Sequence, residues 1–459
     1  MYWRCSLIVR WAHGFRFCYT RDKGTSQPVI RSNIAAIGRR LDRSKTDEKS
    51  GRKGGSSMKF ANLTLVCIAF LAAASDVRPA FAQARAAAQQ KNFKVIYIPP
   101  PVSDAAPETR AAIRNLSAGS ATIALWNYST TAYDGMTYQG TMVGRSPFAH
   151  GHRATTIPTL LVPVVLTFQS TGQVFDPTVT PDPCLGTGNS VADLIVHSPI
   201  FQNSDFVSNG VDVGSTQYLD AFQRANFWTQ VNGTPYHTVF TTSPTVLSPA
   251  SIPALSVTVP IADGSTLLGS GCDTGFIDIN WWDNYVQTTL LPALASNGVN
   301  TTTFPQVIFN SVALTIGPNC CALGYHNAFI NGGGTLQTYS VNDVDNSGAF
   351  GNAPGDTSVM SHEVAEWMDD PNGVNPVPAW GAEGQVSAGN CQNNLEVGDP
   401  LTGTLVASVT LNNFTYTLQE LAFYSWFYGQ NPSYGSGGKY SNGGTFTGFA
   451  KACPPGGTN

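Results

Sequence analysis

The chain has 459 residues, of which 42% are hydrophobic, 11% aromatic and only 12% charged, with 45 glycines and 29 prolines. This composition excludes a disordered chain and a helical bundle, and it favours a loop-rich protein with many strands. Residues 1–57 hold 13 Lys/Arg against 4 Asp/Glu, so the other 402 residues carry 12 against 25. An acidic body lacks the basic footprint of a nucleic-acid-binding protein, so we expect no nucleic-acid partner.

The N-terminal region predicts export. Residues 58–82 begin with Met and Lys, continue through the apolar run Leu63–Ala74, and end in the small-x-small triplet Ala80–Ala82. This order is typical of a signal peptide, and the apolar run is too short to span a membrane. We expect residues 1–57 to be a mis-called upstream extension and residues 83–459 to be a single secreted domain, extracellular or periplasmic, with no stable membrane span. The alternatives are a genuine cytoplasmic arm or a signal anchor.

Six cysteines remain after the predicted cleavage site: Cys184, Cys272, Cys320, Cys321, Cys391 and Cys453. An even number in an exported protein predicts disulfides, but six cysteines allow 15 pairings and the sequence selects none. We expect the adjacent Cys320 and Cys321 to reach different partners. Metal ligation by thiolates is the alternative, although the chain has no C-x-x-C pair.

The first half of the chain alternates short strands with two helices. We expect a strand at 93–98, a small helix at 107–114, and one buried strand over 160–168 in which Pro163 lies at an edge. Apolar residues then recur at helical intervals up to Trp228, with Ser215 or Thr216 available as the cap: Tyr218, Ala221, Phe222 and Ala225. We expect this aromatic stripe to belong to the core.

The second half reads as strands followed by one central helix. We expect short β pieces in 239–267, a strand at 276–280, a helix at 281–294, strands at 307–309 and 312–314, a hairpin across Asn331–Gly334, a loop at 343–356, a strand pair within 406–416, and an aromatic helix near 419–428. Asp356 or Thr357 can cap the central helix, and Pro371 ends it. No repeat of fixed period is present.

The central helix carries the motif H-E-x-x-E. His362 and Glu366 are four residues apart and therefore share one face, with Glu363 beside them. Two ligands on successive turns and a neighbouring general base are what a catalytic metal site requires of a helix. In the zincin motif H-E-x-x-H the second ligand is a histidine. The alternative is a helix whose acidic face is solvated.

A second acidic motif follows about thirty residues later. Glu396 offers a third ligand, and Asp399 offers an acceptor that orients the histidine from the second shell. These residues predict zinc. Carboxylate-rich ligation, with Asp369 and Asp370 close by, leaves calcium as an alternative.

His326, next to Tyr325, is the other histidine of interest. Both residues are candidates for contact with substrate, and the alternative for His326 is a purely structural hydrogen bond. Serine chemistry is not expected, because the chain has no G-x-S-x-G motif. A phosphate-binding loop is not expected either, because the glycine-rich stretch 351–358 lacks the lysine.

The motifs resemble those of a known group of proteins. Ser361–Glu366 followed by Asp370-Pro371, the later Glu396–Asp399 and the earlier Gly324–His326 resemble secreted bacterial and fungal proteins with an S-H-E-x-x-E…D-P core. These are similar in this segment to the plant Exordium, or phosphate-induced, proteins. Two further stretches look like the bacterial subgroup: Asp212–Tyr218 and Leu418–Phe427. The resemblance covers about residues 155–455 and implies secretion and a zincin-like α/β domain, with a mixed sheet and an active-site helix.

Two functions fit these observations. The first is an exported zinc metallopeptidase-like hydrolase that acts on peptides or an extracellular polymer, with His362, Glu366 and Glu396 as ligands and Glu363 as the base. The alternative is a non-catalytic extracellular or cell-wall-associated binding protein of the Exordium-like type.

Overall fold

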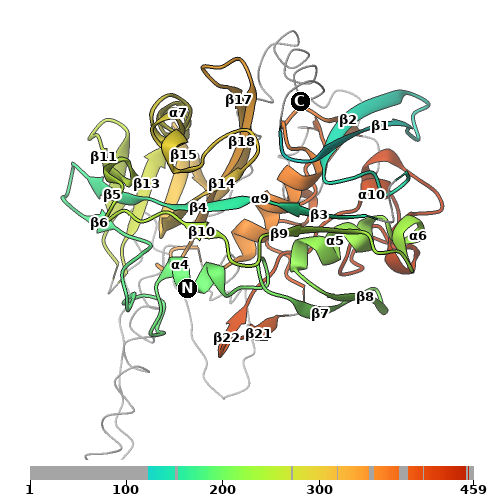
Figure 1. Ribbon diagram of the computed structural model, residues 1–459, viewed down its shortest axis with the longest axis horizontal. Coiled ribbons are helices and arrows are strands. Elements are labelled where there is room, and N and C mark those ends of the chain that lie inside the picture. The colour runs from blue at the N-terminus through green and yellow to red at the C-terminus, as the bar shows by residue number, and fades with distance from the viewer. Residues whose placement is uncertain are drawn as a thin grey trace, which may run out of the picture. The chain divides into compact units, whose positions relative to one another are not determined.

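The computed structural model describes residues 122–149, 153–269, 272–317, 319–350, 356–381, 391–406, 408–450 and 453. All of them belong to one compact unit, Leu71–Asn459. This part of the chain combines many strands in several sheets with few helices, so the predicted mixed α/β class is confirmed (Figure 1). The expected strand at 93–98, the expected helix at 107–114 and the signal peptide lie outside the described residues.

The largest sheet among the described residues is mixed. In spatial order its strands are β10 (Thr245–Val246), β4 (Thr159–Pro163), β14 (Phe304–Asn310), β18 (Leu336–Val344) and β17 (Gly324–Ile330). The first four run parallel to one another, whereas β17 is antiparallel to β18 and lies outermost. The predicted hairpin is therefore confirmed, and the Asn331 side chain closes its turn by accepting the N–H of Gly333 at 3.0 Å.

The apolar segment 160–168 forms two strands and not the single strand that was expected. β4 ends at Pro163, and β5 (Val165–Phe168) joins another sheet between β11 and β6. Pro163 pairs with Ile308 of β14 but with nothing in β10, which reaches only as far as Leu161. Proline cannot donate a ladder hydrogen bond, so its position beyond the end of β10 fits the expected edge.

The remaining strands form smaller sheets around the central one. One contains β11 (Ser256–Val259), β5 and β6 (Val174–Phe175), and another contains β12 (Gly264–Leu267), β13 (Thr274–Asp278), β15 (Val312–Ile316) and β16 (Asn319–Ala322). The others are two-stranded: β1 (Leu125–Thr131) with β2 (Thr137–Val143), β3 (Ala154–Ile157) with β9 (His237–Phe240), β7 (Ser204–Ser208) with β8 (Val211–Thr216), β19 (Pro376–Trp380) with β20 (Gln392–Asn394), and β21 (Val409–Leu411) with β22 (Phe414–Tyr416).

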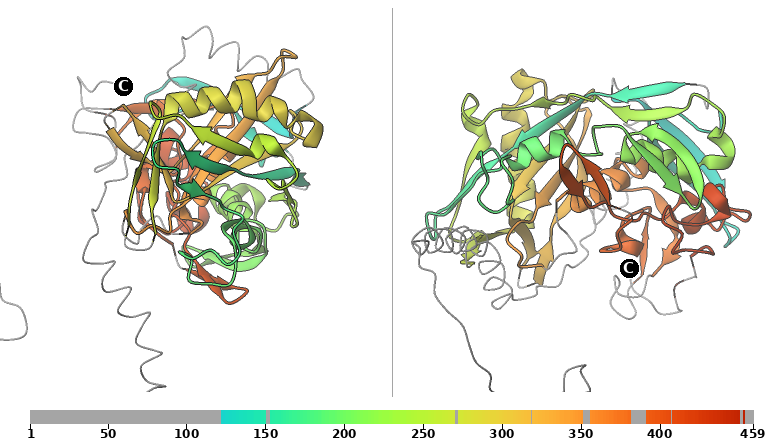
Figure 2. Two further views of the ribbon diagram at one scale, coloured as in Figure 1. Left: turned by 90° about the vertical axis from the view of Figure 1, so that its left-hand side faces the viewer. Right: turned by 90° about the horizontal axis from the view of Figure 1, so that it is seen from below.

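Short helices cover these sheets. Asp278 caps α7 (Ile279–Tyr285), which continues through the π-helical turn Val286–Leu290 into α8 (Leu291–Ala293) as one yellow coil (Figure 2). This coil buries Trp282 and Leu290 against the central sheet. Three further α-helices of the described residues are short: α4 (Val191–Val196), α6 (Trp228–Val231) and α10 (Tyr424–Tyr428). The last is shorter than the helix expected near 419–428.

The predicted amphipathic helix exists as α5 (Tyr218–Asn226), and its aromatic stripe is buried as expected. The predicted caps are wrong, because Ser215 and Thr216 belong to β8 and the residue before the helix is Gln217. The Thr216 hydroxyl instead donates to the Asp220 carboxylate at 2.7 Å, inside the helix.

Helix α9 (Ser358–Asp369) contains the H-E-x-x-E motif. It packs against β17 and β18 on one side and against α5 on the other (Figure 1). Trp367 stacks on Phe304 of β14 with ring centroids 3.5 Å apart. Every residue of α9 is buried, so the alternative of a solvated acidic face is wrong.

Both ends of α9 are held by carboxylates. The expected cap by Thr357 is wrong, since its side chain makes no capping hydrogen bond, and Asp356 instead accepts the N–H of Thr417 at 2.8 Å. At the other end the Asp370 carboxylate accepts the N–H groups of Val374 and Asn375 at 2.9 and 2.8 Å.

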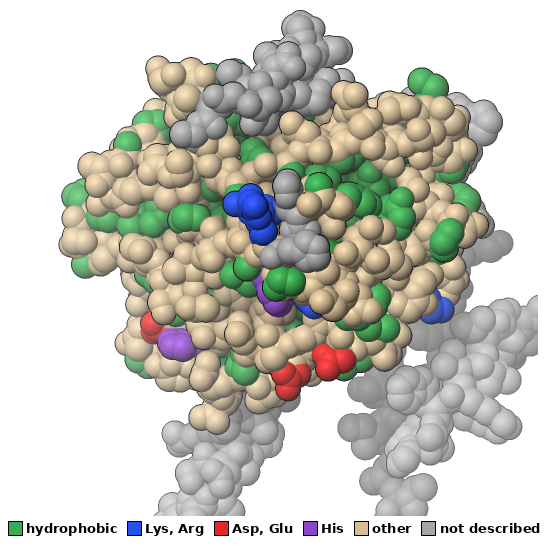
Figure 3. Space-filling view, turned by 45° about the vertical axis from the view of Figure 1, so that its right-hand side comes forward, with side chains coloured by type: hydrophobic (Ala, Val, Ile, Leu, Met, Phe, Trp, Pro, Cys, Tyr) green, Lys and Arg blue, Asp and Glu red, His purple; other side chains and the backbone are tan. Residues whose placement is uncertain are grey.

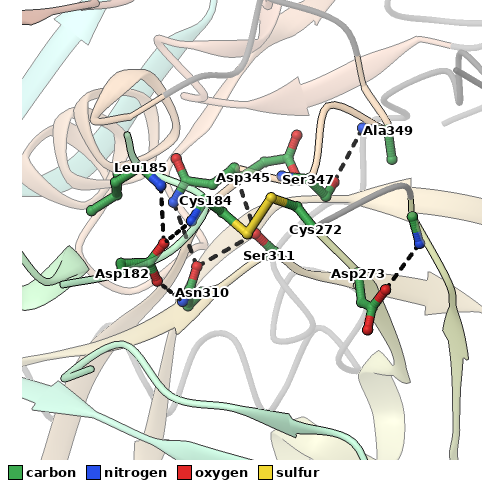
Figure 4. Close-up of a disulfide and its surroundings, with 12 residues drawn as sticks. Asp182, Cys184, Leu185, Cys272, Asp273, Asn310, Ser311, Asp345, Ser347 and Ala349 are labelled. Carbon is green, nitrogen blue, oxygen red and sulfur yellow. Dashed lines mark hydrogen bonds between the residues drawn. A yellow bond between two sulfur atoms is a disulfide. The ribbon is translucent and has the colours of Figure 1, made fainter. Parts of the chain in front are cut away.

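The six cysteines form three pairs: Cys184–Cys272, Cys320–Cys321 and Cys391–Cys453. The expectation that the adjacent cysteines reach different partners is wrong, because the other four pair among themselves. Cys184–Cys272 lies beside the end of β14, where Asp182 accepts the N–H of Cys184 and the side-chain N–H of Asn310 (Figure 4). These three pairs confirm the prediction that the cysteines form disulfides. They do not test the predicted secretion.

Candidate metal centre

Helix α9 presents three side chains to one buried cluster. His362 Nε2 lies 3.1 Å from Glu366 Oε1 and 3.4 Å from Asp399 Oδ1, which comes from the 3₁₀ turn Asp399–Leu401. Glu363 lies farther away, with Oε1 at 4.0 Å from the same nitrogen. His362, Glu366 and Asp399 form a group whose ligand atoms are close enough to hold a metal ion.

The second nitrogen of His362 is held by Gln419. His362 Nδ1 lies 3.1 Å from Gln419 Oε1, and the amide nitrogen of that glutamine donates to the carbonyl of Gly398 at 2.7 Å. Because Oε1 only accepts, Nδ1 carries a proton, and Nε2, which faces the carboxylates, is the nitrogen that could bind a metal ion in place of its own proton. No role at the site was predicted for Gln419, although it lies in the stretch Leu418–Phe427 that resembles the bacterial subgroup, 57 residues from the histidine.

His326 belongs to the same cluster. It lies on β17 and is fully buried, and its Nε2 donates to the Asp370 carbonyl at 3.1 Å. Its Nδ1 has no hydrogen-bond partner and lies 3.8 Å from Glu363 Oε2 and 3.7 Å from Glu366 Oε2. His326, Glu363 and Glu366 form a second group of metal-ligand atoms. The expected structural hydrogen bond is present, but it accounts for only one of the two nitrogens.

Tyr325, the other candidate for substrate contact, lies in the core on the opposite side of β17. Its ring packs edge-on against Tyr339, with centroids 6.1 Å apart, in the cluster that contains α7. Successive residues of a strand point to opposite faces, so His326 faces α9 while Tyr325 faces away from it. Nothing in the structure tests substrate contact by either residue.

The two residues of the second acidic motif lie near different histidines. Asp399 lies next to His362, whereas Glu396 Oε2 lies 3.9 Å from Nε2 of His326. Glu396 is fully buried, and neither of its carboxylate oxygens has a hydrogen-bond partner. The role of Glu396 as a ligand stays a prediction. The role of Asp399 in orienting the histidine from the second shell also stays a prediction, and its Oδ1 faces the same nitrogen, Nε2, as Glu366 does.

The cluster concentrates negative charge in a place that water scarcely reaches. The four acidic residues are each less than 9% exposed as whole residues, and within the described residues their ion pairs involve only histidines: Glu363, Glu366, Glu396 and Asp399. Buried charges require partners, because the protein interior solvates them poorly. A divalent cation would supply the missing positive charge.

Burial and mutual repulsion shift the titration of these groups. Burial, followed by the nearby Glu366 carboxylate, raises the pKa of Asp399 to about 8 and that of Glu396 well above its usual range. Burial favours neutral His362, but Glu366 and Glu363 outweigh it and raise the pKa of this imidazole. The metal-free cluster therefore holds protons at neutral pH that a cation would displace.

Asp369 and Asp370 were the reason for keeping calcium as an alternative metal, but their carboxylates make hydrogen bonds outside the cluster. Asp369 accepts hydrogen bonds from Gln223 and, at 3.0 Å, from Asn226, both on α5. Asp370 holds the turn after the helix. Neither carboxylate belongs to the two groups of ligand atoms, so neither adds oxygen ligands to the cluster in this arrangement.

Two glycines let the chain approach the cluster closely. A Cβ added to Gly398 would lie 2.6 Å from the His362 ring, and one added to Gly324 would lie 2.7 Å from the Cγ atom of Glu363. Any larger residue at either position would displace a candidate ligand. The glycines of both predicted motifs, Gly324–His326 and Glu396–Asp399, thus have a packing role beside the metal group.

No protein-family model, curated protein or solved structure matches this chain. No helix of the described residues is both long and apolar enough to cross a membrane. On the face shown in Figure 3, charged side chains are few and scattered among uncharged polar and hydrophobic ones.

Proposed function

We propose that this chain is a secreted metal-dependent hydrolase, with zinc the expected metal and peptides the expected substrate class. One observation carries the proposal. His362 Nε2, with its proton-bearing nitrogen held by Gln419, faces the carboxylates of Glu366 and Asp399 at 3.1 and 3.4 Å. One imidazole and two carboxylates are ligand types that zinc accepts.

Three residues would bind the metal, and a fourth would act as the general base. His362, Glu366 and Asp399 would hold the cation, which polarises the substrate and eases removal of a proton from water. Glu363 lies just outside this group of atoms, with Oε1 at 4.0 Å from His362 Nε2. Burial raises the pKa of Glu363, which favours its service as a proton acceptor near neutral pH.

The proposal also includes secretion and a family relationship. Three cysteine pairs are typical of proteins that work in an oxidising compartment, which is compatible with secretion. A mixed sheet with an antiparallel outermost strand next to α9 is compatible with a zincin-like domain. We include membership of the S-H-E-x-x-E…D-P group in the proposal.

A Glu363→Gln variant tests the proposal. The variant keeps the size of the side chain but cannot accept a proton, so cleavage of a mixed peptide library should fall at least ~100-fold while the bound metal stays. Glu420→Gln is the matched control, because Glu420 is also a buried glutamate but bonds to Ser441 and Thr445. Unchanged cleavage in Glu363→Gln would remove this residue from the mechanism.

Burial of the cluster favours a second candidate function. The side chains of His362 and Glu363 are only 11% and 10% exposed, and those of the other cluster residues are less so. A cation so enclosed suits a structural role in a non-catalytic extracellular binding protein of the Exordium-like type. Metal at full occupancy together with no cleavage of any peptide or wall polymer would favour this candidate.

A further inference from the structure

The ligand atoms around α9 form two groups that share one residue. The first contains His362, Glu366 and Asp399, and the second contains His326, Glu363 and Glu366. Glu366 uses a different oxygen in each: Oε1 lies 3.1 Å from His362 Nε2, and Oε2 lies 3.7 Å from His326 Nδ1. A carboxylate that offers one oxygen to each side has the arrangement of a bridge between two cations.

One ion does not account for both histidines. Ligand atoms of a single zinc lie at most about 4.2 Å apart, which is twice the usual bond length. Within the described residues, no group of atoms that all lie within 4.8 Å of one another contains both His326 and His362. As placed, the two imidazoles serve separate positions on either side of Glu366.

In the second group the ligand atom of His326 is Nδ1, and this nitrogen makes no hydrogen bond. His326 is fully buried, its Nε2 is used by the Asp370 carbonyl, and its Nδ1 has no hydrogen-bond partner. A buried imidazole nitrogen without a partner loses its hydration and gains nothing in return unless a ligand or ion is present. This nitrogen faces the Glu363 and Glu366 carboxylates, as the nitrogen of a metal ligand would.

The charge of the cluster matches two divalent cations. Four buried carboxylates, those of Glu363, Glu366, Glu396 and Asp399, surround two imidazoles. With all four carboxylates deprotonated, one divalent cation would leave two negative charges buried without compensation, whereas two cations would balance all four. Both oxygens of Glu396 and one of Asp399 also lack partners, so further ligand atoms are available.

We propose that the cluster binds two divalent cations bridged by Glu366, the second held by His326 Nδ1, Glu363 and Glu366. This inference rests on the proposed function, because it adds a second position to the same site. Two-cation sites, with ions about 3.5–4 Å apart, stabilise both the attacking and the leaving oxygen of a hydrolysed bond. In this second position the ligand atom of Glu363 is Oε2, which lies 3.8 Å from His326 Nδ1, so Oε1, on the side of His362, stays available to accept a proton from water.

Cation stoichiometry tests the proposal directly. The full mature chain, stripped with a chelator and saturated with Mn²⁺, should retain two ions by elemental analysis, and His326→Gln should retain one. His237→Gln is the matched control, because His237 pairs with Asp220 outside the cluster, and it should retain two. Two ions in His326→Gln, or one in the unaltered chain, would overturn the second position.

Paramagnetic resonance provides a readout that needs no variant. Two Mn²⁺ ions bridged by one carboxylate should give an exchange-coupled spectrum in the unaltered chain, while a single ion gives an isolated six-line signal. An isolated signal at every loading would overturn the bridged pair but leave the proposed single-metal hydrolase intact. No bound ion at all would instead contradict the proposed function itself.

Discussion

His362 owes its availability as a ligand to a neighbour that the sequence motif does not contain. Gln419 fixes the imidazole through Nδ1, and its amide nitrogen is in turn fixed by the Gly398 carbonyl. The same carbonyl belongs to the residue whose missing Cβ makes room for the ring. Ring orientation and ring position thus depend on one short contact between two loops and the helix.

Replacing Gln419 with leucine should weaken metal binding while leaving the candidate ligands in place. Loss of the oxygen that orients His362 frees the ring to rotate, and the affinity for Zn²⁺ should fall about 10–100-fold. Competition with a chromogenic chelator measures it. Gln306→Leu is the control, because Gln306 is a buried glutamine whose side chain has no hydrogen-bond partner, and its affinity should not change. Equal affinities in all three proteins would contradict this role for Gln419.

At the scale of the element, α9 is positioned by its ends as well as by its packing. Asp356 joins the start of the helix to the segment after β22 by accepting the N–H and the hydroxyl of Thr417 at 2.8 and 2.9 Å. At the far end, Asp369 binds α5 and Asp370 holds the following turn. These contacts set where His362 and Glu366 lie relative to β17.

Stability should depend on pH through Asp356. Burial raises the pKa of this carboxyl from 3.8 to about 6. The folded chain therefore binds its proton more tightly than the unfolded chain does, so a stabilising contribution of ~3 kcal/mol is present below pH 4 and is lost as the pH rises through about 6. Denaturant unfolding at pH 4 to 8 measures the slope. Asp356→Asn should make the slope shallower, and an identical slope in both proteins would contradict the assignment.

At the scale of the whole molecule, the buried negative charge couples stability to metal. A ligand that binds only the folded chain stabilises it by about 4 kcal/mol when present at a thousand times its Kd. Removal of the cation by EDTA should therefore lower Tm measurably in calorimetry, and Zn²⁺ should restore it. A His362→Ala, Glu366→Gln double variant should show no such response. A Tm unaffected by EDTA in the unaltered chain would argue against a bound cation.

Sequence reasoning predicted the parts of this molecule that depend on local spacing. The helix around His362 and the hairpin across Asn331–Gly334 follow from periodicity and turn chemistry. The strand break after Pro163 and the contact of Gln419 do not, because they depend on which distant segments pair in three dimensions. His326 was noticed, but its unpaired nitrogen is visible only once β17 lies against α9.

The most direct test of the account is the position of the metal itself. Crystals of the mature chain, grown with Zn²⁺ and measured on both sides of the zinc absorption edge, should give an anomalous-difference peak about 2.0–2.1 Å from His362 Nε2. A peak there, in contact with Glu366, would establish the cation on which every proposal above depends. A map without such a peak, or with zinc bound only at surface side chains, would contradict the account.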